Sequence, residues 1–124
     1  MDAREWVSLN GRLMPGDQAR ISVFDSGFMQ GVGLFETMRS YGGHVFRLQQ
    51  HLERLISSAR KLGWLVVPDE QQLRENVEQV VEATAHEDAR VRLTVTTGTL
   101  RPTEQDLPEL TVVATATPGA SYPP

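Results

Sequence analysis

The stretch ETMRSYGGHVFRLQQHLERLISSARKLG, residues Glu36–Gly63, decides the fold class. It begins in a predicted strand over residues 34–41, and the pair Gly42-Gly43 predicts a tight turn into a second strand at residues 44–46. The period then changes: the apolar residues fall at helical spacing, at Leu48, Leu52, Leu55, Ile56, Ala59 and Leu62. Gly63 follows, where a glycine often ends a helix. A hairpin followed by a helix over residues 48–62 is therefore expected.

Towards the N-terminus, the sequence predicts short strands joined by turns. Residues 5–9 and 12–14 flank Asn10-Gly11, and Asn-Gly is the strongest short-range signal for a β-hairpin. Residues 19–24 alternate around Ile21 and Val23, which predicts a further short strand.

Towards the C-terminus, the pattern returns from helix to strand. Asp69 is a candidate N-cap for a helix over residues 69–85. Residues 90–97 and 110–117 alternate again and predict two strands. Strands, then two helices, then strands indicate an α+β fold: a mostly antiparallel sheet with both helices packed on one face.

Composition narrows the class of protein. The chain has 124 residues, 40% hydrophobic and 23% charged, which is typical of one soluble globular domain. A net charge of -4 argues against a nucleic-acid or anionic-membrane surface. There is no cysteine, no membrane-length apolar run and no signal peptide, so a cytoplasmic protein is expected.

Three glycines, Gly27, Gly31 and Gly33, follow one another in the stretch FDSGFMQGVGLFETMR at residues 24–39. Their spacing, G-x-x-x-G-x-G, differs from the G-x-G-x-x-G of a dinucleotide-binding turn, and a strand rather than a helix follows. The residues alone favour a tight turn, since glycine permits positive φ.

Most familiar catalytic patterns are missing. The three histidines, His44, His51 and His86, lack a metal-ligand spacing, and no G-x-S-x-G elbow occurs. Lys61, the only lysine, falls in the last turn of a predicted helix, where a cation suits the helix dipole. No catalytic residue and no metal site are therefore assigned.

Arg54 allows two interpretations, an anion-binding residue or an exposed residue in a surface ion pair. An arginine fork matches a phosphate or carboxylate group, and Ser58 lies one turn further on. The pattern alone favours an exposed arginine that pairs with Glu53 or Glu75.

Several pieces occur together in a fixed order. They are the Asn10-Gly11 hairpin, the Asp25-Ser26-Gly27 turn, Gly31-x-Gly33-x-Phe35-Glu36, Phe46, and His51-x-x-Arg54-Leu55-x-x-Ser58-Ala59. In this order they resemble the N-terminal domain of the class IV, fold-type IV, pyridoxal-phosphate-dependent aminotransferases, strongly over residues 6–63 and more loosely beyond. That group includes branched-chain and D-amino-acid aminotransferases and aminodeoxychorismate lyases.

The resemblance implies an arrangement of domains. Residues 1–117 would be the small α+β domain, and residues 118–124 the start of a linker to a C-terminal catalytic domain that this chain does not contain. It also implies pyridoxal 5'-phosphate as cofactor, amino acids and 2-oxo acids as substrates, and a homodimer.

The resemblance also implies roles for individual residues. Arg54 matches the arginine that holds the cofactor phosphate, and Phe35 matches an aromatic residue beside the substrate. Phe28 and Gln30 fall near positions where some subfamilies carry tyrosine, so the subfamily stays open. Arg101 lies near the place of an arginine that binds the substrate carboxylate.

Two parts of the family's chemistry have no counterpart in these residues. No residue matches the lysine that forms an imine with the cofactor, or the acidic partner of its pyridine nitrogen. The chain by itself is therefore expected to be inactive. The parent protein would be an aminotransferase or an aminodeoxychorismate lyase, and the alternative is an interaction domain that kept the fold without catalysis.

Overall fold

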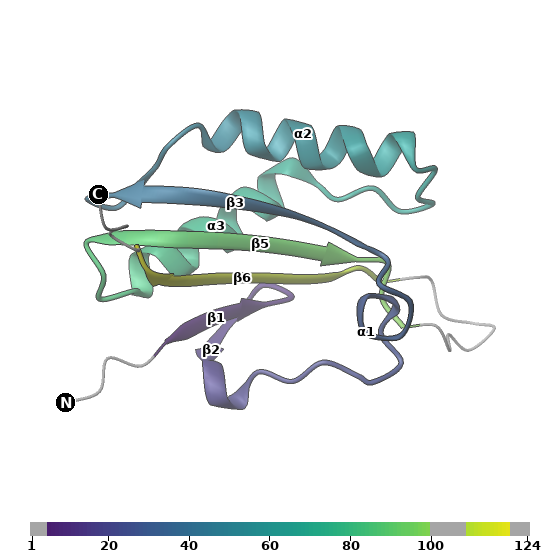
Figure 1. The fold of residues 1–124 in the computed structure, drawn as a ribbon, viewed down its shortest axis with the longest axis horizontal. Coiled ribbons are helices and arrows are strands. Elements are labelled where there is room, and N and C mark those ends of the chain that lie inside the picture. The colour runs from purple at the N-terminus through teal and green to yellow at the C-terminus, as the bar shows by residue number, and fades with distance from the viewer. Residues whose placement is uncertain (1–4, 100–108, 120–124) are drawn as a thin grey trace, which may run out of the picture.

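A computed structural model describes residues 5–99 and 109–119. Its centre is a six-stranded sheet with the strand order β2-β1-β6-β5-β3-β4, in which all neighbouring strands run antiparallel (Figure 1). The strands are β1 Trp6–Leu9, β2 Arg12–Pro15, β3 Gly33–Tyr41, β4 His44–Val45, β5 Asp88–Thr96 and β6 Thr111–Pro118. The helices are the 3-10 turn η1 Gly16–Gln18, the short α1 Ser26–Gln30, α2 Leu48–Lys61 and α3 Glu70–Ala83.

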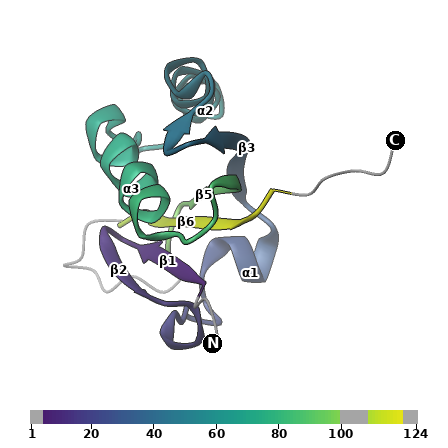
Figure 2. The ribbon, with the colours of Figure 1, turned by 90° about the vertical axis from the view of Figure 1, so that its left-hand side faces the viewer.

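The two long helices, α2 and α3, lie on the same face of the sheet (Figure 2). The core between these layers holds Leu52 and Leu55 from α2, Leu73 and Val77 from α3, and alternate residues of the central strands such as Leu93. All five are at most 1% exposed. The α+β fold with two helices on one face is confirmed.

Local sequence signals set the ends of these elements. Asn10 and Gly11 both take positive φ, 51° and 85°, as the tight turn between β1 and β2 requires. The Asp69 carboxylate accepts a hydrogen bond from the Gln72 backbone N–H at 2.9 Å and caps α3. Gly63, at φ 77°, follows the end of α2.

The strand predicted at residues 19–24 is wrong. This segment has no regular strand, and Ile21 and Val23 are 48% and 58% exposed. Alternation stabilises a strand only where a neighbouring strand and a core receive it. The glycine-rich stretch that follows forms the helix α1, which ends at Gly31 with φ 67°.

Asp25 fixes the position of α1 at the end of the sheet. Its buried carboxylate accepts hydrogen bonds from the Gly27 backbone N–H at 2.8 Å, from Thr96 Oγ1 at 3.0 Å and from Thr111 Oγ1 at 2.6 Å. Gly27 is required for this contact, because a Cβ there would lie 2.5 Å from the Thr96 methyl. The predicted turn chemistry of Asp25-Ser26-Gly27 therefore anchors a helix to two strands.

Only the start of the expected linker lies within the described residues. Strand β6 ends at Pro118, and residues 120–124 of the expected linker lie outside the described residues. Within the described part of the chain, every helix is too short or too polar to cross a bilayer.

The central position of β5 predicts where the fold is most sensitive. Leu93→Ala should lower the free energy of unfolding by about 2–5 kcal/mol, because it opens a cavity between the sheet and the helices. Chemical denaturation measures the change. Leu65→Ala is the control, since Leu65 is 92% exposed, and equal effects of the two substitutions would contradict the placement of the core.

Candidate functional site

Strand β3 presents two kinds of residue on its two faces. Leu34, Glu36 and Met38 point towards the helices, whereas Phe35 points to the opposite face. Glu36 is the exception among its neighbours, because a carboxylate occupies a position that the strand pattern reserves for the core. Its side chain is only 7% exposed.

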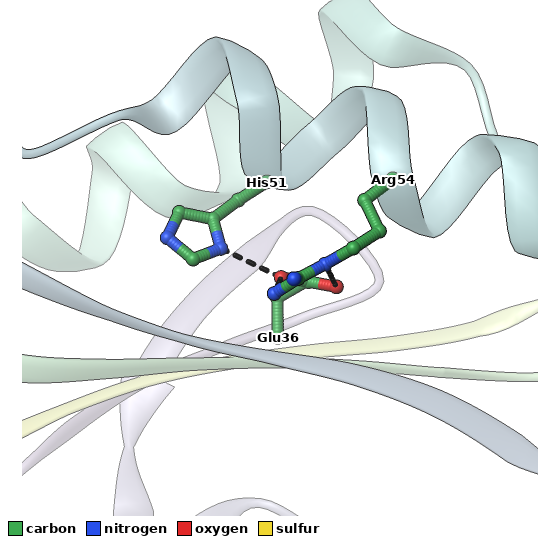
Figure 3. Close-up of polar contacts among 3 residues, drawn as sticks. All are labelled: Glu36, His51 and Arg54. Atoms are coloured by element: carbon green, nitrogen blue, oxygen red, sulfur yellow. Dashed lines mark hydrogen bonds and ion pairs between the residues drawn. The ribbon is translucent and has the colours of Figure 1, made fainter.

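Two side chains from α2 bind the Glu36 carboxylate (Figure 3). Arg54 donates from Nε to Oε2 at 2.9 Å and from Nη2 to Oε1 at 2.6 Å, a bidentate pair. His51 Nδ1 lies 2.6 Å from Oε1. His51 and Arg54 are one turn apart on the helix, so both reach the same carboxylate.

These contacts oppose the effect of burial on Glu36. Burial raises the pKa of the carboxyl group, but the hydrogen bonds and charges of Arg54 and His51 outweigh it and hold the pKa below its ordinary value of 4.5. The same hydrogen bond raises the pKa of the Arg54 guanidinium. Glu36 and Arg54 are therefore a charged pair at neutral pH.

The pairing expected for Arg54 from the helix pattern is wrong. Its partner is Glu36, eighteen positions away, and not Glu53 or Glu75. Glu53 accepts a hydrogen bond from Gln49 instead. Because Arg54 satisfies a buried carboxylate, its removal should lower the stability of the protein, contrary to what an exposed arginine would imply.

The other face of β3 forms part of an open pocket of about 450 Å³. Phe28 from α1 and Phe35 from β3 both line it, so the structure brings these two predicted residues together. Arg92 of β5 lies over the Phe35 ring, with its guanidinium carbon 4.0 Å from the ring centroid. Gln30 is exposed at the end of α1, and Arg101 lies outside the described residues.

The two halves of this candidate site lie on opposite faces of β3, and the outer edge of this strand is largely uncovered. Strand β4 pairs only with Ser40 and Tyr41, which leaves the remainder of that edge without a neighbouring strand in the described structure. A ligand or another segment placed along this edge could contact Arg54 on one face and Phe35 on the other.

The donor set around Arg54 fits a phosphate group. Glu36 uses two N–H groups of the guanidinium, the other donors stay free to bind an anion, and 69% of the side chain is exposed. Lys61 is exposed at the end of α2. Nowhere in residues 5–99 and 109–119 do three His, Asp or Glu side chains gather as a metal site.

Sequence reasoning missed the roles of three residues of this site: Glu36 as an organising group, His51 as its second partner, and Arg92. The signal for Glu36 was present, because it is a charged residue in phase with the buried positions of a strand. Arg92 could be placed on the open face of β5 by alternation, but its contact with Phe35 depends on the pairing of β3 and β5.

Comparison with known proteins gives a family match. Residues 33–124 match the family model described as amino-transferase class IV. A D-alanine aminotransferase of Listeria monocytogenes is 30% identical over 103 residues, which are 83% of this chain and 36% of that protein. An aminodeoxychorismate lyase of Bacillus subtilis is 35% identical over 94 residues, 74% of this chain and 32% of that protein.

Solved structures of larger proteins contain the same fold. The branched-chain aminotransferase of Thermoproteus uzoniensis with norvaline superposes with a TM-score of 0.78 at 28% identity, over 94% of this chain and 41% of that one. The branched-chain amino acid aminotransferase from Escherichia coli gives 0.78 at 23% identity, over 94% and 41%, and shows the fold alone. The chain spans about a third of the length of the curated relatives it matches.

The lowered pKa of Glu36 predicts a specific dependence of stability on pH. Well above pH 4.5 the carboxylate is ionised in the folded and the unfolded chain, and its contribution to stability is complete. As the pH falls from 4.5 towards the lower pKa of the folded state, the unfolded chain takes up the proton first, so stability is lost. Denaturation of the wild type and of Glu36→Gln across this range should give a steeper acid loss for the wild type.

The control for this comparison is Glu53→Gln, which removes an exposed carboxylate from α2 and should leave the dependence of stability on pH as in the wild type. Parallel profiles for the wild type and Glu36→Gln would contradict the assignment of the buried ion pair.

Proposed function

The chain belongs to the amino-transferase class IV family, and from this premise we propose that it is the N-terminal part of a pyridoxal-phosphate-dependent enzyme. The enzyme would transfer an amino group between an amino acid and a 2-oxo acid. The greater length of the matched relatives supports a further C-terminal domain that completes the site. We assign the segment that follows β6, up to residue 124, to the linker between the two domains, since Pro118 itself is the last residue of β6.

The observation that carries this proposal is the exposed guanidinium of Arg54 on a fixed support. The ion pair with Glu36 orients the fork and leaves the other N–H groups of the guanidinium without this partner, on a side chain that is 69% exposed. A phosphate dianion prefers such a permanently charged, planar donor. Arg54 then binds the cofactor phosphate and fixes one end of the cofactor relative to β3.

The open face of β3 is assigned to the substrate side. Phe28 and Phe35 supply apolar surface, and Arg92 is a cation that lacks an ion-pair partner within the described residues. Amino acids and 2-oxo acids both carry a carboxylate, which matches an arginine. We assign Gln30 to the rim of this pocket, and Arg101 to a second contact with the substrate carboxylate.

The chemistry is divided between cofactor and protein. When bound, pyridoxal phosphate supplies the electron sink for cleavage at the amino-acid α-carbon. The described residues hold its phosphate, line the substrate pocket and contribute a cation to it. The imine-forming lysine belongs to the proposed C-terminal domain. A cytoplasmic homodimer is part of the same proposal.

A lyase is the second candidate, because the relative from Bacillus subtilis bears that activity in its name. Activity assays of the longer protein with and without a 2-oxo acid separate the two reactions. A transaminase turns over only when a 2-oxo acid accepts the amino group, whereas a lyase releases its product without one.

Arg54→Ala should weaken binding of pyridoxal phosphate by about tenfold or more in the longer protein, since it removes charge-assisted hydrogen bonds. The affinity of Arg54→Lys for the cofactor should lie between those of the wild type and Arg54→Ala, because lysine keeps the charge but loses the fork. Titration followed by cofactor absorbance measures the three affinities. Equal affinities would remove Arg54 from the site.

The 124-residue chain should form no specific imine with the cofactor. Its one lysine, Lys61, is exposed on the last turn of α2, whereas an imine-forming lysine is usually activated by a desolvated pocket or a neighbouring cation. Equimolar cofactor, borohydride reduction and intact-mass analysis test this, with Lys61→Ala as control. Stoichiometric labelling that Lys61→Ala abolishes would place the imine on this chain.

A further inference from the structure

We propose that Glu36 is a positioning residue for phosphate binding: it acts through Arg54, with His51 as the second support. This proposal rests on the assignment of Arg54 as the phosphate anchor. It adds that the anchor needs a buried carboxylate to be effective.

Stability alone does not explain a carboxylate at this position. Glu36 lies between Leu34 and Met38 on the face of β3 that packs against α2. Replacing a buried ion pair by well-packed apolar side chains is often neutral or stabilising. An apolar residue in place of Glu36 would therefore stabilise the fold at least as well. What an apolar residue could not do is direct the guanidinium of Arg54.

The geometry of the pair restricts Arg54 to one orientation. The two parallel contacts, Nε to Oε2 and Nη2 to Oε1, hold the guanidinium in a defined plane with respect to the carboxylate. The remaining N–H groups then point away from Glu36. A long side chain that is 69% exposed would otherwise sample many rotamers.

His51 fixes the carboxylate from the other side. An ionised carboxylate only accepts hydrogen bonds, so the 2.6 Å contact requires His51 Nδ1 to carry the hydrogen. Oε1 is then shared between His51 and Arg54, which opposes rotation of the Glu36 carboxylate. The histidine and the arginine of the His51-x-x-Arg54 spacing thus act on one acceptor.

Glu36 also has an opposing effect on an anion. Its negative charge reduces the attraction between Arg54 and a phosphate group. Water screens this repulsion at an exposed guanidinium, whereas the hydrogen bonds to phosphate depend on orientation at short range. We therefore expect the loss of orientation to outweigh the gain in net positive charge.

The experiment compares two variants of the 124-residue chain that each remove one negative charge. Glu36→Gln keeps the size of the side chain but presents an amide to the donors of Arg54 and His51. Glu53→Gln is the matched control on the exposed side of α2. Inorganic phosphate is titrated at neutral pH, and the arginine Nε–H NMR signals report binding and the mobility of Arg54.

Glu36→Gln should weaken phosphate binding by about tenfold and make the free Arg54 signal mobile, whereas Glu53→Gln should bind phosphate at least as well as the wild type. If Glu36→Gln does not fold, Glu36→Asp replaces it. Aspartate keeps the charge but is one methylene too short for the two-point contact, so it should weaken binding as well. Wild-type affinity or tighter binding in the folded variant would overturn the proposal.

A second background separates positioning from a general structural effect. In Arg54→Lys there is no fork to orient, so adding Glu36→Gln should cause no further loss of phosphate affinity. An equal further loss in that background would show that Glu36 does not act through Arg54. If Arg54→Ala binds phosphate as well as the wild type, the anchor itself fails. If Arg54→Ala weakens binding and Glu36→Gln does not, only the role of Glu36 fails.

Discussion

A carboxylate in the core-facing row of a strand must be satisfied from the helix above it. Glu36 imposes this constraint on β3, and Arg54 and His51 of α2 meet it. The contact fixes which side of α2 faces the sheet, beyond what the apolar residues Leu52 and Leu55 require. It also determines where the N–H groups of Arg54 that Glu36 does not use can point.

The placement of Glu36 divides the candidate site between two faces of one strand. Residues next to each other in a strand point in opposite directions, so Glu36 and Phe35 cannot share a cavity inside this chain. Arg54, the proposed phosphate anchor, lies on the helix side, and the aromatic pocket lies on the open side. A cofactor that contacted both would have to lie along the uncovered edge of β3, and this geometry supports the proposal of a further domain that completes the site.

Most of the fold could be predicted from local patterns, whereas the site could not. The switch of period at Leu48 and the caps at Asp69 and Gly63 depend on residues close in sequence, and they gave helices α2 and α3 within two residues. Alternation at residues 19–24 was misleading, because a strand also needs a partner. The pair Glu36–Arg54 joins residues eighteen positions apart, and no local pattern favours it over the expected pairing of Arg54 with Glu53 or Glu75. The phosphate role of Arg54 came from the family resemblance, and it remains a prediction together with the role of Arg101.

The most direct measurement is a crystal structure of the longer protein with its cofactor bound. We predict that the Arg54 guanidinium lies within hydrogen-bond distance of the cofactor phosphate while its Nε and Nη2 groups still contact Glu36. The cofactor ring should extend across the edge of β3 towards Phe35. A phosphate bound elsewhere, with Arg54 paired only to Glu36, would contradict the role of this chain as the phosphate-binding half of the site.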